Sequence, residues 1–238
     1  MNDTPSDDAW RAYWNGDAVS LYVCPRHLRA HYDAILGALT PHLPSDRPFT
    51  LLDFGCGDAL AAPALAARGA RVLLYDRSDA ARRRLQARFA DTPGITVLDD
   101  DAYAALPAGA VDRLLTISVI QYVSEDRLCE LLAEWRRLIA PDGRLILADV
   151  LAPGNGAAAD TLSLLRFAAV HGFLWPALRG LATTAATDYP KLRRRVGLCR
   201  YSESDMLTRL RDAGFTARRA ERNVSPSPHR QTFIATPG

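Results

Sequence analysis

The sequence predicts an α/β fold, a doubly wound Rossmann-like sheet with helices on both faces, and two observations predict it. Short apolar runs alternate with amphipathic helical patterns through residues 48–150 of the 238-residue chain. The first run, residues 50–52, passes through an acid into a glycine-spaced turn, the layout of a buried strand that delivers a turn to a helix start. A chain of this length can bury the core of one such domain and carry an added lobe.

Composition and charge narrow the class of protein. Hydrophobic residues make up 48% of the chain and charged residues 24%, as in an ordinary globular protein. The formal net charge of +2 gives no reason to expect nucleic acid as a partner. The four cysteines lack the paired spacing of a zinc or redox site, so we expect no metal site and the reduced thiols of a cytoplasmic protein. The acidic, polar start of the chain is not a secretion signal.

Residues 1–48 are predicted to form an N-terminal helical cap. Aromatic residues are dense from residue 9 onward, and a helical pattern extends over residues 25–39. A segment with three prolines, residues 40–48, then ends this helix. The aromatic residues either lie over a ligand or cover an edge of the core, and both readings stay open. The cap residues considered as ligand contacts are Tyr13, Trp14 and Tyr22.

The first strand leads into the main candidate site. Its apolar residues are followed by Asp53 and then by Gly55 and Gly57, and a helical pattern extends over residues 60–68. Glycine can take positive φ and has no Cβ, so a ligand can lie directly against the backbone of this turn. Asp53, at the carboxyl end of the strand, can accept a hydrogen bond from an ammonium or hydroxyl group.

A second strand, residues 71–75, ends in Asp76. An acid at this strand tip, roughly 20 residues past the glycines, is placed to hold both hydroxyl groups of a ribose. Two acids on either side of a glycine turn therefore predict an adenosine-containing ligand. The dinucleotide fingerprint requires a third glycine at position 60, where this chain has Leu60.

Two helices and three strands are predicted between residues 78 and 149. A helix over residues 79–90 begins after Ser78, a candidate N-cap, and a helix over residues 125–140 carries an apolar stripe. The strands are predicted over residues 95–98, 111–117 and 144–149, the last of them after a Pro-Asp-Gly turn at residues 141–143.

Three successive acids, Asp99, Asp100 and Asp101, follow the third strand. Like charges gathered at one strand end are costly unless something binds there. The alternative is a helix N-cap whose neighbouring acids are favoured by the helix dipole.

Residues 151–200 form an insert before the last helix. Its long apolar stretch, residues 161–178, is interrupted by Arg166, His171 and Pro176, so we expect two helices divided near Gly172 rather than a membrane span. The insert is predicted to be a lid that shapes an acceptor pocket. The alternatives are a homodimer surface and a peripheral membrane contact through the basic residues 191–195.

The chain ends with a helix and two strands. Ser202 and Asp205 form a candidate capping box at the start of a helix that reaches residue 212. An Ala-Gly-Phe sequence at residues 213–215 then leads into strands over residues 216–220 and 231–235.

These motifs resemble class I S-adenosylmethionine-dependent methyltransferases of the small-molecule type. The turn resembles the family's acid-x-Gly-x-Gly-x-Gly motif, with Ala59 in place of the third glycine. The Pro-Asp-Gly strand and the Ala-Gly-Phe ending are also typical of the family, and the likeness covers residues 48–150 and 200–236. It implies a seven-stranded sheet with an antiparallel last strand, and a methyltransferase domain over residues 49–238 that includes the insert.

The resemblance also implies a site for S-adenosyl-L-methionine. Asp53 and the backbone of Gly55 and Gly57 would hold its methionine end, and Asp76 its ribose. Asp101, followed by Ala102, would contact the adenine, with Asp100 as the alternative one residue earlier. The further expected cofactor contacts are Cys56, Arg77, Ser118 and Tyr13.

The acceptor side is less defined. An apolar insert predicts a small apolar or aromatic acceptor, and His171 is the candidate base, with Tyr122 as a second candidate catalytic residue. Whether a base is needed, and whether the acceptor atom is oxygen, nitrogen or carbon, stays open. The alternative functions are a non-catalytic scaffold with this fold and a nicotinamide-dependent oxidoreductase.

Overall fold

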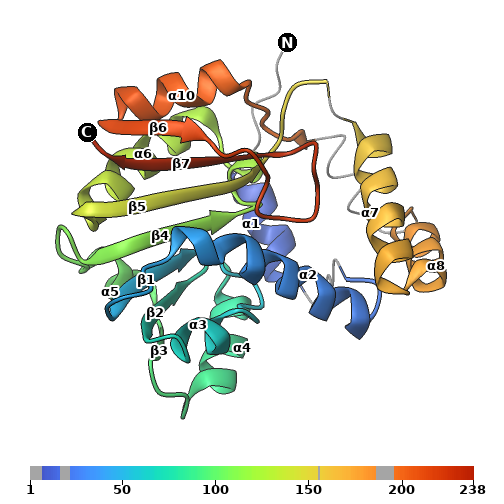
Figure 1. The fold of residues 1–238 in the computed structure, drawn as a ribbon, viewed down its shortest axis with the longest axis horizontal. Helices are drawn as coiled ribbons and strands as arrows, with labels where there is room; N and C mark the ends of the chain where they lie inside the picture. Colours follow the sequence, from blue (N-terminus) through green and yellow to red (C-terminus); the bar gives the residue numbers. More distant parts are fainter. Residues whose placement is uncertain (1–6, 17–21, 155, 186–195) are drawn as a thin grey trace.

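A seven-stranded sheet runs through the middle of the protein (Figure 1). The computed structural model describes residues 7–16, 22–154, 156–185 and 196–238. The strand order is β3-β2-β1-β4-β5-β7-β6, and all neighbouring strands are parallel except β7, which is antiparallel to β5 and β6. The predicted α/β sheet with an antiparallel last strand is therefore confirmed. The strands are β1 (Phe49–Phe54), β2 (Ala70–Tyr75), β3 (Ile95–Val97), β4 (Val111–Ile117), β5 (Ile139–Val150), β6 (Phe215–Arg219) and β7 (Gln231–Pro237).

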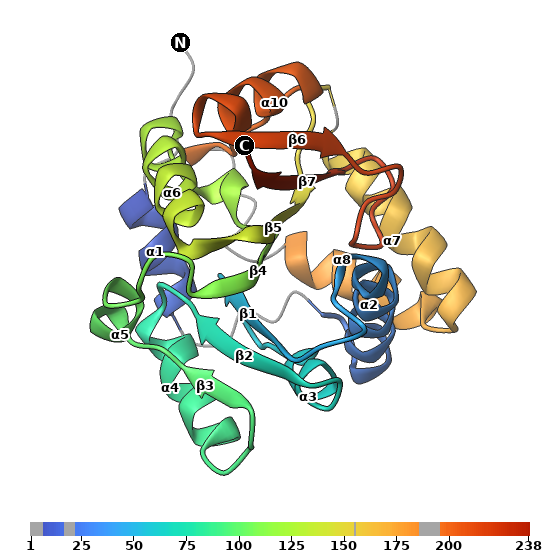
Figure 2. The same cartoon turned by 60° about the vertical axis from the view of Figure 1, so that its left-hand side comes forward.

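Helices cover both faces of the sheet, with α6 on one side and α2 and α3 on the other (Figure 2). Leu51 of β1 packs with α3 and α4, whereas the next residue, Leu52, packs with α5, α6 and α10. Successive side chains of a strand point to opposite faces, so strands buried on both sides form continuous apolar runs. The helices are α1 (Asp7–Asn15), α2 (Pro25–Leu39), α3 (Ala62–Ala66), α4 (Asp79–Phe89), α5 (Asp100–Ala104), α6 (Glu125–Leu138), α7 (Ala157–His171), α8 (Leu174–Ala185) and α10 (Glu203–Asp212).

Most predicted helix ends coincide with capping groups. The Ser78 hydroxyl accepts a hydrogen bond from the backbone N–H of Ala81 at the start of α4, at 3.2 Å. At the start of α10, Ser202 and Asp205 exchange the two hydrogen bonds of a capping box. These local signals could be read from the sequence because both partners lie within one helical turn.

Two predicted boundaries were wrong for local reasons. The helix after the glycine turn begins at Ala62 rather than at residue 60, because Ala59 takes a left-handed conformation with a φ of 47°. Strand β5 begins at Ile139, before the Pro-Asp-Gly sequence rather than after it. Its pairing with β4 shifts register between Val111 and Arg113, and this irregularity accommodates the extra residues in β5.

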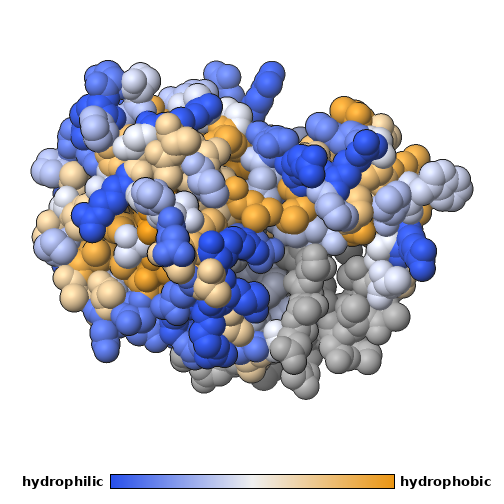
Figure 3. Space-filling model, turned by 90° about the horizontal axis from the view of Figure 1, so that it is seen from below, coloured by the Kyte–Doolittle hydropathy of each residue, from blue (hydrophilic) through white to orange (hydrophobic). Residues whose placement is uncertain are grey.

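The insert forms the two predicted helices, α7 and α8, which stand to the side of the sheet beyond α2 (Figure 1). Gly172 separates them in a left-handed conformation with a φ of 72°. No helix within the described residues is long and apolar enough to cross a membrane. Hydrophobic surface is visible on the side of the molecule where the insert lies (Figure 3). Within the insert, the side chains of Val170 and Trp175 are 81% and 82% exposed. The basic residues 191–195 lie outside the described residues.

The glycine turn after β1 packs closely against the segment that follows β4. Gly55 has a φ of 72°, and a Cβ at this position would lie 2.4 Å from Cγ2 of Val119. Only glycine fits this position without moving its neighbour, because both the backbone conformation and the available space exclude a side chain.

We therefore expect Gly55→Ala to lower the free energy of unfolding by about 3 kcal/mol, through overpacking added to left-handed strain. The control is Gly69→Ala, because Gly69 has a φ of 86° but no atom within 4 Å of its Cβ position. This control should cost about 1 kcal/mol. Urea unfolding measures both variants, and equal losses would contradict the steric argument. Adding Val119→Ala should recover part of the Gly55→Ala loss.

Candidate active site

Hydrogen bonds from the glycine turn connect the carboxyl end of β1 to that of β2. The backbone N–H groups of Gly55 and Cys56 both donate to the carbonyl of Tyr75, at 2.8 and 3.3 Å. The N–H of Gly57 donates to one carboxylate oxygen of Asp76 at 3.0 Å, and the N–H of Ser78 donates to the other at 2.8 Å. The turn and the tip of β2 therefore form one unit in which Asp76 is the shared acceptor.

Asp53 lies at the end of β1, beside this unit. Its half-buried carboxylate accepts no hydrogen bond from any residue that the structure describes. Burial, and then the negative charge of Asp76, raise the pKa of Asp53 to about 7. Burial also raises the pKa of Asp76, where the hydrogen bonds from Ser78 and Gly57 oppose the effect. Two acids in this state form a strong acceptor site for a cationic or hydroxyl-bearing ligand.

The three acids after β3 have three different surroundings. Asp99 is the N-cap of α5 and accepts the N–H of Ala102 at 2.8 Å. Asp100 accepts hydrogen bonds from the Tyr75 hydroxyl at 2.8 Å and from Arg82 at 3.0 Å. Asp101 is exposed and has no such partner among the described residues. The helix-cap alternative therefore accounts for Asp99, and Asp101 is the one of the three acids whose carboxylate has no partner among the described residues.

A buried network lies at the carboxyl ends of β4 and β5. Asp149, only 3% exposed, accepts hydrogen bonds from the hydroxyls of Ser118 and Ser225, from Arg230, and from the Asn223 amide at 3.0 Å. Burial alone would raise the pKa of Asp149, but the charge of Arg230 and these hydrogen bonds outweigh it and hold the pKa below its usual range. Asp149 is therefore an ionised, fully paired group beside the predicted contact Ser118.

The same network reaches the insert. Arg230 also donates to the Asp160 carboxylate of α7 at 3.0 Å, and Nε2 of His229 lies 2.8 Å from that carboxylate. His229 is joined in turn to the Ser163 hydroxyl at 3.1 Å. The loop between β6 and β7 thus holds α7 next to the carboxyl end of β5.

Helix α1 covers the other side of this region. The Ser78 hydroxyl donates to the carbonyl of Trp14 at 3.0 Å, which attaches α1 to the start of α4. The Tyr122 ring lies 4.6 Å from the Trp10 ring and 5.5 Å from the Trp14 ring, and Tyr13 completes the cluster at 5.1 Å from Trp14. The structure thus brings the predicted residues Tyr13 and Tyr122 into one aromatic group.

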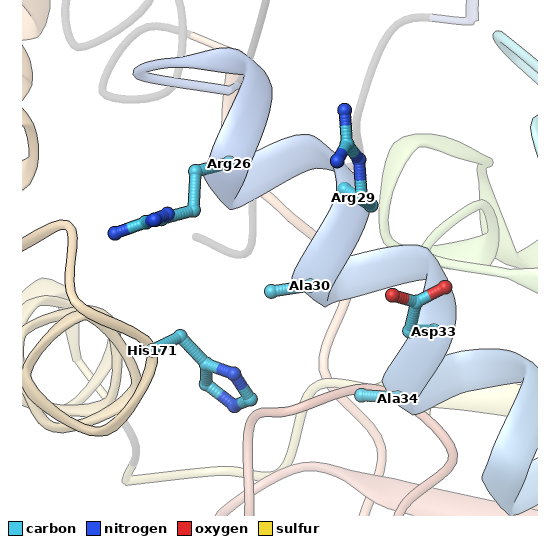
Figure 4. Close-up of a pocket in the computed structure, with 6 residues that line it drawn as sticks. All are labelled: Arg26, Arg29, Ala30, Asp33, Ala34 and His171. Atoms are coloured by element: carbon cyan, nitrogen blue, oxygen red, sulfur yellow. The ribbon is translucent and has the colours of Figure 1, made fainter.

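The remaining predicted site residues lie in two separate places, near the glycine turn and at the end of α7. Cys56 is buried within the turn, where burial raises the pKa of its thiol well above the usual value, and Arg77 is half-buried at the tip of β2. His171 lies elsewhere, exposed at the end of α7. It lines an open groove of about 490 Å³ between α7 and the outer face of α2, with Arg26 and Asp33 among the lining residues (Figure 4). None of the lining residues comes from the glycine turn.

Sequence reasoning missed the network around Asp149. Asp149 ends an apolar strand as Asp53 and Asp76 do, so the same signal pointed to it. Arg230, in contrast, lies 81 residues further along the chain in a loop without a recognisable motif.

Comparison with known proteins identifies the fold unit that carries this site. Residues 52–147 match the family described as a methyltransferase domain. Uncharacterized methyltransferases of Mycobacterium tuberculosis and Mycobacterium bovis are each 32% identical over 129 residues. The aligned part covers 54% of this chain and 62% of each relative, so the chain spans about three fifths of the length of the curated relatives it matches.

Solved structures share the fold over nearly the whole chain. The protein bound to the Trm112 methyltransferase activator of Haloferax volcanii has a TM-score of 0.61 at 15% identity, covering 97% of this chain and 95% of that one. DhpI in complex with SAH gives 0.61 at 15% identity, covering 98% and 97%. Magnesium protoporphyrin IX methyltransferase of Synechocystis PCC 6803, with bound SAH, gives 0.56 at 20% identity, covering 97% and 93%. At these identities the likeness is one of fold.

The raised pKa of Asp53 predicts a pH-dependent gain in stability from Asp53→Asn. Because the folded-state pKa, about 7, lies above the usual value of 3.8, stability from this group is present in acid and is lost as the pH rises through 7. The variant should be more stable than the wild type by about 2 kcal/mol near pH 8, a figure discounted for partial exposure. The difference should shrink toward pH 5.

Urea unfolding across this pH range measures the effect. Asp33→Asn, which changes an exposed acid on α2, is the matched control and should show no such trend. A stability difference for Asp53→Asn that does not change with pH would rule out the raised pKa.

Proposed function

We propose that the protein, whose residues 52–147 match the methyltransferase domain family, transfers a methyl group from S-adenosylmethionine to a small-molecule acceptor. The observation that carries the proposal is the unit formed by the glycine turn, Asp53 and Asp76 at the carboxyl ends of adjacent parallel strands. Ligands of open α/β sheets bind at this edge.

The residues present fit this cofactor. No atom lies within 4 Å of the Cβ position of Gly57, so the backbone there is open to a ligand. The Asp53 carboxylate has no hydrogen-bond partner among the described residues and matches the ammonium group of the methionine end. In the proposal Asp76 receives the ribose hydroxyls and Asp101 the adenine amino group.

The chemistry assigned to the chain is mainly alignment. When bound, the cofactor supplies a methyl group already activated by its sulfonium. The chain's residues would hold the acceptor atom in line with that methyl carbon, at about 3 Å, and exclude water from the site. The aromatic group of Trp10, Tyr13 and Tyr122 on α1 and the segment after β4 is proposed as the cover that excludes water.

Two other functions are less favoured. A nicotinamide-dependent oxidoreductase would need a glycine at the position of Leu60. A non-catalytic scaffold would not need Asp53, whose raised pKa costs stability at neutral pH, to be kept beside Asp76.

Calorimetric titration of the purified protein with S-adenosylmethionine, and separately with NAD, tests the proposal. Micromolar binding of S-adenosylmethionine alone is expected. Binding of NAD alone would favour the oxidoreductase, and binding of neither would favour the scaffold.

Gly57→Ala provides a residue-level test. The added Cβ would occupy the space proposed for the cofactor, so affinity for S-adenosylmethionine should fall at least about tenfold. Gly69→Ala introduces a similar left-handed strain away from the turn and should leave this affinity unchanged. Both variants should lose about 1 kcal/mol of stability, so a matching loss of affinity in both would place the effect in folding rather than in binding.

A further inference from the structure

A cluster of four rings lies on the inner face of α2 and just before it. The Tyr22 ring is at its centre, 5.3 Å from the His27 ring, 5.3 Å from the His31 ring and 5.9 Å from the Tyr32 ring. The hydroxyls of Tyr22 and Tyr32 are hydrogen-bonded to each other. None of these four residues lines the outer groove that contains His171.

This ring cluster lies next to the glycine turn. Tyr32 packs against the hydrophobic cluster that includes Cys56 and Ala59 of the turn. Ile35, one helical turn after His31 on α2, belongs to the buried cluster that includes Ile146 and Ala148 of β5. The helix that carries the rings is therefore packed against both the glycine turn and the central strands, and the charges of Asp53 and Asp149 act on Tyr32 and His31 respectively.

The two histidines of the cluster have different surroundings. His27 is 7% exposed, stacks on Phe173 with ring centroids 4.8 Å apart, and accepts the N–H of Val23 at Nδ1 over 3.4 Å. Burial, and then the charge of His31, lower the pKa of His27 to about 4. These contacts place His27 in a structural role between α2 and the insert.

His31 is half-buried, and neither of its ring nitrogens has a hydrogen-bond partner among the residues that the structure describes. Burial lowers its pKa; the charge of Asp149 opposes this effect and the charge of Arg230 adds to it. His31 is therefore a neutral imidazole near physiological pH whose basic nitrogen is available. The rings of Tyr22, Tyr32 and His27 lie 5.3, 5.8 and 6.0 Å from the His31 ring, and the charges that act on it are those of Asp149 and Arg230.

We propose that His31 is the general base of the reaction and that Tyr22 and Tyr32 line a subsite for an aromatic hydroxyl acceptor. This inference rests on the proposed function. Rings on several sides of His31 suit a planar aromatic acceptor. Arg230, the cation among the described residues whose charge acts on His31, is already paired with Asp149 and Asp160, so it offers no free charge to an acidic acceptor.

The proposed step couples proton transfer from the acceptor to methyl transfer from the cofactor. The acceptor hydroxyl gives its proton to a ring nitrogen of His31 while its oxygen forms a bond to the methyl carbon. The bond between that carbon and the sulfur breaks, and its electron pair stays on sulfur. The products are a methyl ether, S-adenosylhomocysteine and a His31 imidazolium, which then releases its proton to water.

The test measures methyl transfer from S-adenosylmethionine to two groups of phenols at mildly alkaline pH. One group, including phenol, 4-methylphenol and 2-naphthol, stays protonated there; 4-nitrophenol is largely ionised and needs no base. With His31→Gln, turnover of the protonated phenols should fall about 100-fold, while turnover of 4-nitrophenol and affinity for S-adenosylmethionine change little. A purely structural role would lower both turnovers together and would overturn the proposal.

Two other histidines serve as matched controls. His42→Gln changes a histidine in the 3-10 turn at residues 40–42, at the opposite end of α2, and should leave both turnovers unchanged. If turnover of the protonated phenols falls with His171→Gln but not with His31→Gln, His171 is the general base and the proposal is overturned. If the wild type binds S-adenosylmethionine but methylates only amines or carboxylic acids, or no phenol of the set, the acceptor class is wrong. If it does not bind S-adenosylmethionine at all, the proposed function itself fails.

Should His31→Gln fail to fold, His31→Asn is the replacement variant, with the same contrast expected between protonated phenols and 4-nitrophenol. Equal effects on the two groups of phenols would again overturn the role of His31.

Discussion

The carboxylate of Asp76 is the interaction on which the rest of the site depends. It accepts the N–H groups of Gly57 and Ser78, and so joins the turn that leaves β1 to the helix start that follows β2. Parallel neighbouring strands end at the same edge of a sheet, and both chain segments must turn there with their backbone donors satisfied. One acid satisfies a donor from each segment. This arrangement leaves the Gly57 backbone open and places Asp53 near Asp76, and there burial, and then the charge of Asp76, raise the pKa of Asp53.

Backbone strain is concentrated at the same edge. The non-glycine residues with positive φ in the described parts of the chain are Ala59, Ser118 and Asp149, at 47°, 60° and 65°. Each follows or ends one of the central strands β1, β4 and β5. Such conformations cost about 1–2 kcal/mol each and persist where neighbouring bonds hold them. Ser118 and Asp149 are joined by a side-chain hydrogen bond. The strained residue that follows β4 and the one at the end of β5 therefore stabilise each other's position.

The proposed acceptor side is assembled from three separate parts of the chain. Helix α2 packs Ile35 against β4, β5 and β7, and this fixes the position of His31 one turn earlier on the same helix. The contacts that hold the insert include Phe173 on His27 and Asp160 with Arg230. A change in either contact would move the insert relative to α2, so selectivity for the acceptor and stability of the insert are expected to be linked.

The sequence by itself determined the α/β class, the glycine turn, the two acids that flank it and most helix starts, because these features depend on residues within one turn or one strand. Only the tertiary structure decided which acids after β3 are already paired, since Arg82 reaches Asp100 from another helix. It also placed His171 on an exposed helix end and His31 half-buried beside the Tyr32 ring. A helical pattern identifies an inner face, but what that face meets is set by strands and loops more than a hundred residues away, and no local signal encodes that contact.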